Sequence, residues 1–194
     1  MKIGVLGLQG AVREHLRSLS LLGIEAVPVK RVEDLPQVSG LVFPGGESTT
    51  IALLASGGLL EELRQRARGR FPLFGTCAGM ILLAKEVEGQ DEASIPAIDI
   101  AVARNASGRQ VESFETTLDV LGVGKDVPAV FIRAPYITRV GRDVSVLARH
   151  DGIPVAARQG NVLVTSFHPE LTDDLRVHRY FVSMVSEQRK EVLA

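Results

Sequence analysis

Short apolar runs alternate with segments of helical periodicity through the first half of the chain. Runs with the composition of buried β-strands occupy residues 2–8, 25–29, 40–43 and 72–74. Between them, apolar side chains recur at helical spacing in two segments, 12–22 and 59–68. This alternation of buried strands and amphipathic helices predicts a largely parallel sheet that is covered by helices on both faces.

The pattern changes beyond residue 86. Strand-like runs there cover residues 97–103, 111–120, 129–132 and 161–167, and polar or turn-rich segments lie at 88–95 and 104–110. Two hairpins are predicted, with turns at Asp151–Gly152 and Gln159–Asn161. A terminal helix should begin within residues 172–174 and turn four apolar residues to the core: Val177, Phe181, Met184 and Val185. We therefore expect an α/β fold with a largely parallel central sheet and a mixed or antiparallel C-terminal portion.

The strand-to-helix turn around Cys77 is the clearest candidate for chemistry. Gly75-x-Cys77-x-Gly79 has the G-x-S-x-G pattern of a nucleophile elbow, with sulfur in place of oxygen, and the helix formers of residues 78–85 follow it. A helix N-terminus favours the thiolate form of such a cysteine. A lone cysteine is more often a small buried apolar residue, so a functional role requires partners elsewhere in the chain.

Two other loops should share an edge of the sheet with Cys77. Residues 44–50 (Pro-Gly-Gly-Glu-Ser-Thr-Thr) follow the third strand, and one of the hydroxyl residues 48–50 should cap a helix from Ile51 onward. Gln9–Gly10 follows the first strand. Because the carboxyl ends of parallel strands share one edge, where ligand sites form, these loops should converge on the cysteine. In isolation, residues 44–50 would be an ordinary strand-to-helix turn.

A base for the cysteine is found where the strand at 161–167 ends in His168-Pro169-Glu170. A cysteine nucleophile needs a nearby base, and that base needs an acceptor on its other nitrogen. Residues i and i+2 of an extended segment point the same way, so Glu170 should reach His168. The other three histidines are poorer candidates. We expect His15 and His178 on helix surfaces and His150 exposed before a hairpin turn.

Composition narrows the functional classes. The 194 residues are 45% hydrophobic, enough for one well-buried core, so we expect a single domain over residues 1–194. A formal net charge of −1 gives no basic excess for nucleic acid. One cysteine cannot form an internal disulfide, residues 1–8 lack a signal-peptide pattern, and no apolar run approaches the ~20 residues that span a bilayer. A cytoplasmic protein without a membrane segment is expected, with neither metal nor cofactor.

The elbow, the double-glycine loop and the His-Pro-Glu strand end, in this order in one domain, resemble the class I glutamine amidotransferases. These are Cys-His-Glu enzymes with a flavodoxin-like, three-layer α/β fold. Six stretches carry a narrower resemblance, to the glutaminase subunits of pyridoxal 5'-phosphate synthase: residues 7–15, 44–50, 74–79, 104–110, 131–135 and 166–172. They span the chain almost end to end.

This resemblance implies hydrolysis of L-glutamine to L-glutamate and ammonia through a cysteine thioester. The ammonia would pass to a synthase subunit, in a large hetero-oligomer, that builds pyridoxal 5'-phosphate from a pentose phosphate and a triose phosphate. Cys77, His168 and Glu170 match the family's catalytic triad. The positions that match the family's glutamine-contacting residues are Gly46, Glu47, Ser48, Arg104, Ile132 and Arg133.

Chemical reasoning assigns further roles. The oxyanion needs two N–H donors, for which we expect Ala78 and either Gly45 or Gly46. Arg104 or Arg133 suits the glutamine carboxylate, with Arg104 preferred for direct charge pairing. Glutaminase subunits of this type resemble gated enzymes that are weak until the synthase docks, and Gln9–Gly10 borders the site as a possible activation switch.

Two alternatives remain open from the sequence. One is a docking subunit that has lost catalysis, against which the intact Cys77, His168 and Glu170 argue. The other is a cysteine hydrolase of the same fold that acts on peptides or γ-glutamyl conjugates. The glutamine-type loop at residues 46–48 argues against it.

Overall fold

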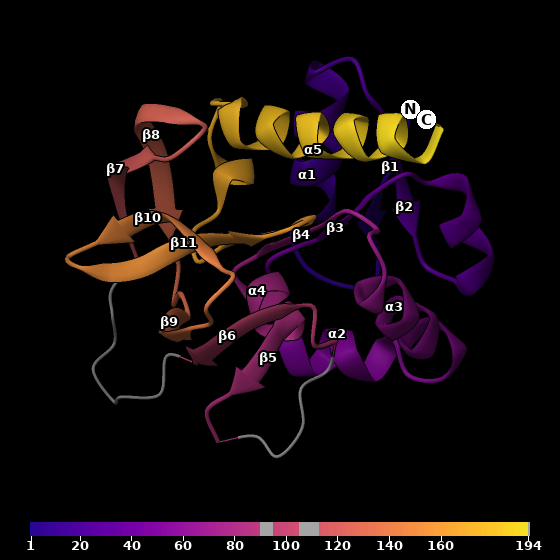
Figure 1. Ribbon diagram of the computed structural model, residues 1–194, viewed down its shortest axis with the longest axis horizontal. Coiled ribbons are helices and arrows are strands. Elements are labelled where there is room, and N and C mark those ends of the chain that lie inside the picture. Colours follow the sequence, from indigo (N-terminus) through magenta and orange to yellow (C-terminus); the bar gives the residue numbers. More distant parts are fainter. Residues whose placement is uncertain (90–94, 105–112, 194) are drawn as a thin grey trace.

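A seven-stranded sheet forms the centre of the molecule in the computed structural model, which describes residues 1–89, 95–104 and 113–193. The strand order is β10-β11-β12-β4-β3-β1-β2. The bounds are β1 (Lys2–Leu6), β2 (Glu25–Val29), β3 (Leu41–Phe43), β4 (Leu73–Thr76), β10 (Ser145–His150), β11 (Ile153–Gln159) and β12 (Val162–Thr165). β2, β1, β3, β4 and β12 run parallel, whereas β10 and β11 pair antiparallel. This architecture confirms the expected fold class (Figure 1).

Both predicted hairpin turns are confirmed. Asp151 and Gly152, which join β10 to β11, have φ values of 48° and 80°. Two successive positive φ angles suit a tight hairpin, because they match the twist of the flanking strands. Gly160, with φ of 54°, turns β11 into β12.

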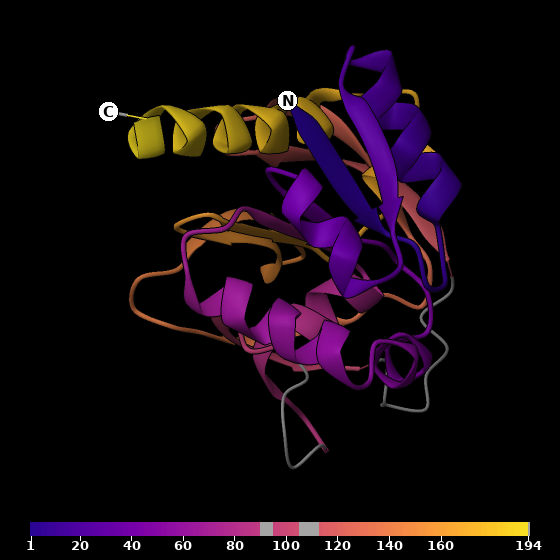
Figure 2. The same cartoon turned by 90° about the vertical axis from the view of Figure 1, so that its right-hand side faces the viewer.

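Helices cover the sheet on both faces (Figure 2). α1 (Val12–Leu21) and α5 (Arg176–Leu193) pack on one face, and α2 (Ser48–Leu54), α3 (Gly58–Arg68) and α4 (Ala78–Leu83) pack on the other. Alternate residues of a strand point to opposite faces, so Val42 of β3 joins the core under α1 and α5 while Phe43 joins the core under the other helices. The four apolar residues of α5 expected to face the core are all buried. Among the described residues, no helix is long and apolar enough to cross a membrane.

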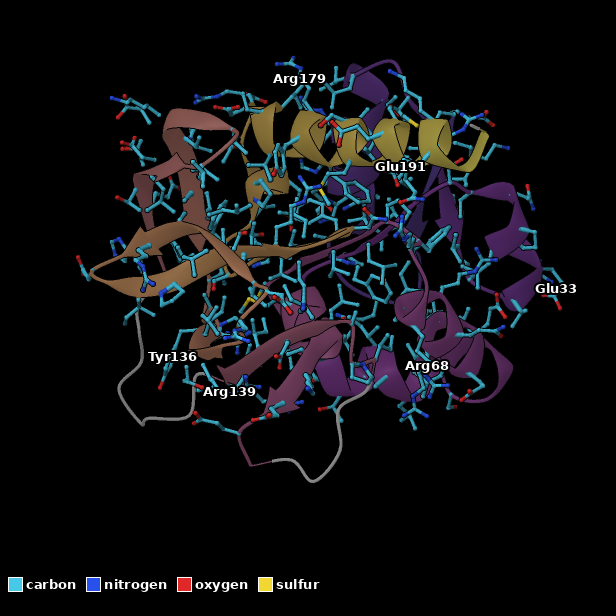
Figure 3. The ribbon with its side chains drawn as sticks, viewed as in Figure 1. Glu33, Arg68, Tyr136, Arg139, Arg179 and Glu191 are labelled. Atoms are coloured by element: carbon cyan, nitrogen blue, oxygen red, sulfur yellow. The ribbon has the colours of Figure 1, made fainter. Side chains whose placement is uncertain are left out.

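Two small sheets flank the central one. β7 (Phe114–Val120) and β8 (Gly124–Phe131) form an antiparallel pair, and β5 (Ala84–Val87), β6 (Ile98–Ala103) and β9 (Tyr136–Val140) form a three-stranded sheet. Arg139 ties this second sheet together, since its Nη2 lies 2.8 Å from Glu86 Oε1 and 3.1 Å from Asp99 Oδ1. Figure 3 shows Arg139 at this edge of the molecule, and Glu33, Arg68 and Arg179 projecting from other parts of its periphery.

Several predicted boundaries are wrong. The helix expected over 78–85 ends at Leu83, because residues 84–87 pair with β6 and this pairing overrides the helix propensity of Ala84 and Lys85. α5 begins at Arg176, after a turn in which Asp174 Oδ1 accepts a hydrogen bond from the Arg176 N–H at 2.9 Å. Of the predicted segments at 88–95, 104–110 and 111–120, residues 90–94 and 105–112 lie outside the described residues.

Candidate active site

The carboxyl ends of four neighbouring parallel strands, β1, β3, β4 and β12, meet at one edge of the central sheet. Cys77 occupies the turn between β4 and α4 with φ of 49° and ψ of −106°, a strained conformation for a residue other than glycine. Its N–H donates to the Thr165 carbonyl of β12 at 2.8 Å, and the residue is 8% exposed. The backbone therefore holds the thiol at a fixed position with limited access to solvent.

Two glycines of the elbow, Gly75 and Gly79, lie so close to neighbouring backbone atoms that no side chain fits there. A Cβ at Gly79 would lie 2.1 Å from the carbonyl oxygen of Phe43 in β3, and one at Gly75 would lie 2.6 Å from the carbonyl group of Gly79. Both obstacles are backbone atoms, which cannot rotate away. α4 can thus pack directly onto β3 and β4 only if these positions lack side chains.

His168 and Glu170 come together beside the cysteine. His168 Nδ1 lies 2.7 Å from Glu170 Oε1, and the imidazole also interacts with Cys77. Since Nδ1 is taken by the carboxylate, Nε2 is the nitrogen left for the thiol. The expected reason for this pairing is wrong, because Glu170 lies in a 3₁₀ turn, Pro169–Leu171, and not on an extended segment. Pro169 begins that turn, and the turn folds the carboxylate back onto the ring.

The charges of the pair reinforce each other. Burial disfavours the imidazolium, but hydrogen bonds to Cys77 and Glu170 outweigh it and raise the pKa of His168 to about 10. Burial likewise disfavours the carboxylate, yet His15 and His168 outweigh it and hold the pKa of Glu170 well below its ordinary value. The arrangement therefore favours an imidazolium next to the sulfur and an ionised carboxylate behind it.

The loop after β3 passes directly over the histidine. A Cβ at Gly45 would lie 2.3 Å from His168 Cε1, so only glycine fits. The Gly45 N–H donates to Thr76 Oγ1 at 3.1 Å, and its carbonyl accepts from the Ala11 N–H at 2.9 Å. Because the Gly45 amide is already engaged, Gly46 is the glycine whose amide remains for an oxyanion.

Glu47, and not a hydroxyl residue, caps the following helix, which begins at Ser48 and not at Ile51. Its carboxylate accepts from the N–H groups of Thr49 at 3.1 Å and Thr50 at 2.6 Å. The Thr50 hydroxyl, which donates to Glu47 Oε2 at 2.6 Å, and then these N–H groups lower the pKa of the exposed Glu47 carboxyl. The Glu47 N–H in turn donates to Gln9 Oε1 at 2.8 Å, which ties the loop after β1 to the loop after β3.

A cavity of about 290 Å³ opens at the cysteine. Its lining contains eight of the predicted site residues, together with Ile81 and Pro135: Gly46, Glu47, Ser48, Cys77, Ala78, Arg104, Ile132 and Arg133. Arg104 Nη1 donates to Thr49 Oγ1 at 3.3 Å, while its buried Nε has no hydrogen-bond partner among the described residues. Arg133 has φ of 44°, a left-handed turn that brings the backbone after β8 to the rim of the cavity. Gly45, His168 and Glu170 lie behind this lining, and Gln9 and Gly10 border it through Gly46.

Two histidines expected on the surface are wholly buried. His15 Nδ1 lies 2.9 Å from His178 Nε2, and His15 Nε2 lies 3.1 Å from Thr76 Oγ1 and 3.5 Å from Glu170 Oε1. The sequence did contain a signal for this burial. His15 follows Val12 by three positions and precedes Leu19 by four, so it belongs to the apolar face of its helix.

His150 was also expected to be exposed, but it is half-buried. Its ring stacks on Phe114 and Phe131, with centroid separations of 5.0 Å and 5.7 Å. Among the described residues, no group of three or more His, Cys, Asp or Glu side chains could hold a metal ion.

A thiol on a strand-to-helix elbow, backed by a histidine and a carboxylate at the carboxyl edge of a parallel sheet, defines a cysteine-dependent α/β hydrolase. Comparison with known families narrows this class. The model of the SNO glutamine amidotransferase family matches residues 5–187, and the chain belongs to that family.

Individual relatives agree with this membership. The chain is 57% identical over 190 residues to a Bacillus cytotoxicus protein named pyridoxal 5'-phosphate synthase subunit PdxT, covering 97% of each. A crystal structure of a glutamine amidotransferase is 51% identical and matches with a TM-score of 0.89 over 95% of this chain and 98% of that one. A putative GMP synthase component from Thermoplasma acidophilum is 18% identical, with a TM-score of 0.74 over 100% of this chain and 98% of the other, which supports the fold alone.

Proposed function

We propose that the chain hydrolyses L-glutamine with Cys77, His168 and Glu170 and delivers the ammonia to a synthase subunit that makes pyridoxal 5'-phosphate. The observation that carries this proposal is the cavity at the elbow. Its lining brings the thiol together with a cationic side chain, Arg104, and with the backbone of the 46–48 loop. A small amino acid with a carboxylate at one end and a carboxamide at the other matches this combination.

The geometry supports a two-step hydrolysis. The Cys77 sulfur attacks the side-chain carbonyl of glutamine, and the oxyanion is held by the N–H groups of Ala78 and Gly46. His168 donates its proton to the nitrogen, so ammonia leaves and a thioester remains. Water, deprotonated by the same histidine, then attacks the thioester, which releases glutamate and restores the thiol. Glu170 stabilises the imidazolium in each step.

The other residues that line the cavity at Cys77 recognise the substrate. The Arg104 guanidinium binds the α-carboxylate of glutamine, and its unpartnered Nε is consistent with that role. Ile132 and Arg133 contribute backbone groups from the left-handed turn at the rim. Glu47 and Ser48 complete the loop that faces the substrate, and the Glu47 carboxylate acts there mainly by capping α2.

The proposed partner is inferred from the names of the relatives, which are called subunits of pyridoxal 5'-phosphate synthase. The synthase partner condenses ammonia with a pentose phosphate and a triose phosphate, and the two proteins assemble into a large hetero-oligomer. Gln9 and Gly10 form the activation switch, since Gln9 contacts Glu47 beside the oxyanion loop. Residues 1–194 act as one cytoplasmic glutaminase domain that needs neither metal nor cofactor.

The decisive experiment measures glutamate and pyridoxal 5'-phosphate with and without the synthase subunit. We expect glutamate to form much faster in the presence of the synthase, and pyridoxal 5'-phosphate to form from glutamine. Cys77→Ala should abolish both activities with glutamine while it still binds the synthase and supports synthesis from added ammonium. Glutamine hydrolysis that does not respond to the synthase would refute the proposed pathway, and hydrolysis retained by Cys77→Ala would refute the assigned nucleophile.

A further inference from the structure

A chain of buried polar groups extends behind the triad, into the layer where α1 and α5 cover the same face of the sheet (Figure 1). His15 of α1 lies at its centre, in contact with His178 of α5, Thr76 of β4 and Glu170. Both histidines are 0% exposed. Burying two imidazoles costs free energy unless they are hydrogen-bonded, so the partners of His15 decide what this cluster can do.

The surroundings of His15 define where its proton lies. Its Nε2 faces two oxygen atoms, Thr76 Oγ1 at 3.1 Å and Glu170 Oε1 at 3.5 Å. One of these oxygens belongs to an ionised carboxylate, so Nε2 carries a hydrogen and donates it. The other ring nitrogen, Nδ1, lies 2.9 Å from His178 Nε2, so one nitrogen of this pair donates to the other.

His178 fits this arrangement. Burial, together with the nearby His15, lowers the pKa of His178 to about 3, so its ring is neutral at physiological pH. Its Nδ1 is buried and has no partner among the described residues. An unpaired ring nitrogen costs less as a bare acceptor than as an orphaned N–H, which places the single proton of His178 on Nε2, pointing at His15.

Thr76 connects this chain to the oxyanion loop. Its hydroxyl oxygen accepts from the Gly45 N–H at 3.1 Å as well as from His15. The Gly45 carbonyl is held by Ala11, one turn before His15 on the same segment. The first turn of α1 therefore holds the glycine loop directly through Ala11 and indirectly through His15 and Thr76.

We propose that His15 is a positioning residue. Its Nε2–H lies between the Thr76 hydroxyl and the Glu170 carboxylate, donates to them, and so aligns the triad carboxylate with the oxyanion loop. His178 acts through His15 by setting its tautomer. This inference rests on the proposed glutaminase function for its kinetic consequence. Its structural content, a coupling between His15 and the ionisation of the triad, does not depend on the substrate.

The groups that face Glu170 come from three elements. His15 lies on α1, His178 on α5 and His168 at the end of β12. A cavity of about 210 Å³ outside the carboxylate is lined by further charged residues, Arg13, Glu14, Arg17 and Asp173. Of these groups, only His15 and His168 have a nitrogen within 4 Å of the Glu170 carboxylate. Removing the His15 N–H should therefore raise the pH at which Glu170 becomes protonated.

A matched pair of substitutions at His15 tests the proposal in the complex with the synthase. The terminal amide of glutamine reaches the position of Nε2, whereas that of asparagine reaches only the position of Nδ1. We expect His15→Asn to lower kcat for glutamate release by about 10- to 100-fold, as is typical when a group that orients an active-site residue is lost. His15→Gln should recover most of that loss. KM should change little in either variant, because His15 does not line the cavity at Cys77.

A second measurement does not involve glutamine. Cys77 is the only cysteine, so the rate of its alkylation by iodoacetamide reports its thiolate fraction at each pH. The acidic limb of this profile should move to higher pH in His15→Asn and return toward the wild-type position in His15→Gln. His150→Asn, at a histidine that contacts Phe114, Phe131 and Asp151 and no triad residue, is the control and should leave the profile unchanged. This readout stands even if the wild-type chain releases no glutamate, a result that would refute the proposed function instead.

Equal kcat values and equal alkylation profiles for wild type and His15→Asn would overturn the proposal. So would equal losses in His15→Asn and His15→Gln, because they would indicate a general packing defect. Melting temperatures and synthase binding of the two variants provide the check on folding.

Discussion

His168 Nδ1 and Glu170 Oε1 lie 2.7 Å apart, and a single residue separates His168 from Glu170 in the chain. The 3₁₀ turn at Pro169–Leu171 makes this contact possible by reversing the backbone after β12. The base and the group that orients it are therefore one local unit, which β12 delivers to the cysteine as a whole.

This local pair predicts how stability depends on pH. The pKa of His168 is raised from 6.5 to about 10, so its stabilisation is complete below pH 6.5 and is lost as the pH rises toward 10. The pKa of Glu170 is lowered from 4.5, so its stabilisation is complete above pH 4.5 and is lost in more acidic solution. Glu170→Gln should thus lower the free energy of unfolding most between about pH 4.5 and 6.5, by roughly 3–5 kcal/mol.

Urea unfolding at a series of pH values measures this difference. Glu191→Gln is the matched control, since Glu191 lies 3.4 Å from Arg70 on the surface and should contribute little at any pH. A difference between wild type and Glu170→Gln that stays constant from pH 5 to pH 10 would contradict the assigned ion pair.

Arg104 and Arg133 both line the cavity, and they should respond differently to substitution. Arg104→Met removes the proposed partner of the glutamine carboxylate and should raise KM by about 10- to 100-fold, the equivalent of a charge-assisted hydrogen bond. Arg133→Met should change KM by less than about threefold, because that side chain is exposed and its proposed role uses the backbone. Steady-state kinetics with the synthase present would separate the two, and the opposite ranking would reassign the carboxylate site to Arg133.

Gln9 should govern activation more than chemistry. Its Oε1 accepts from the Glu47 N–H at 2.8 Å and lies against Gly46, so its movement can reorient the oxyanion loop. Gln9→Ala is expected to reduce the ratio of glutaminase rates with and without synthase. Parallel binding measurements would show whether docking itself persists. An activation ratio equal to that of wild type would remove Gln9 from the switch.

The glycines of the elbow allow a structural test that needs no substrate. Gly79→Ala would place a Cβ 2.1 Å from the Phe43 carbonyl oxygen, so α4 must move away from β3, at a cost of about 1–3 kcal/mol or more. Gly58→Ala, also in the first turn of a helix, meets its nearest neighbour at 3.6 Å and should leave stability unchanged or slightly raise it. Thermal unfolding of both variants distinguishes the effects, and equal melting temperatures would contradict the close approach.

Most of the fold was predictable because its strands are buried on both faces and its helices are amphipathic, both of which are local patterns. Cys77 and His168 were predictable for a related reason, since each lies at the end of such a strand beside turn residues. β5 was missed, because residues 84–87 become a strand only through pairing with β6, which no local pattern reveals. The cap formed by Glu47 was missed in favour of neighbouring hydroxyl residues with stronger capping preference.

The buried histidines show a second limit of prediction from the sequence. His15 was placed on the surface because a histidine in a helix is usually solvated, although its spacing from Val12 and Leu19 put it on the apolar face. Its burial is acceptable only because His178, Thr76 and Glu170 supply hydrogen bonds. Those partners are distant in the sequence, so the satisfaction of a buried polar group cannot be deduced from one helix.

The position of β12 beside β4 also has a consequence for biosynthesis. Synthesis proceeds from the N-terminus, so the ribosome completes the elbow and its thiol well before β12, His168 and Glu170 emerge. Until that last parallel strand inserts between β4 and β11, the nascent polypeptide carries a cysteine without its base. The reactivity of the thiol is thereby withheld until the final strand of the sheet is in place.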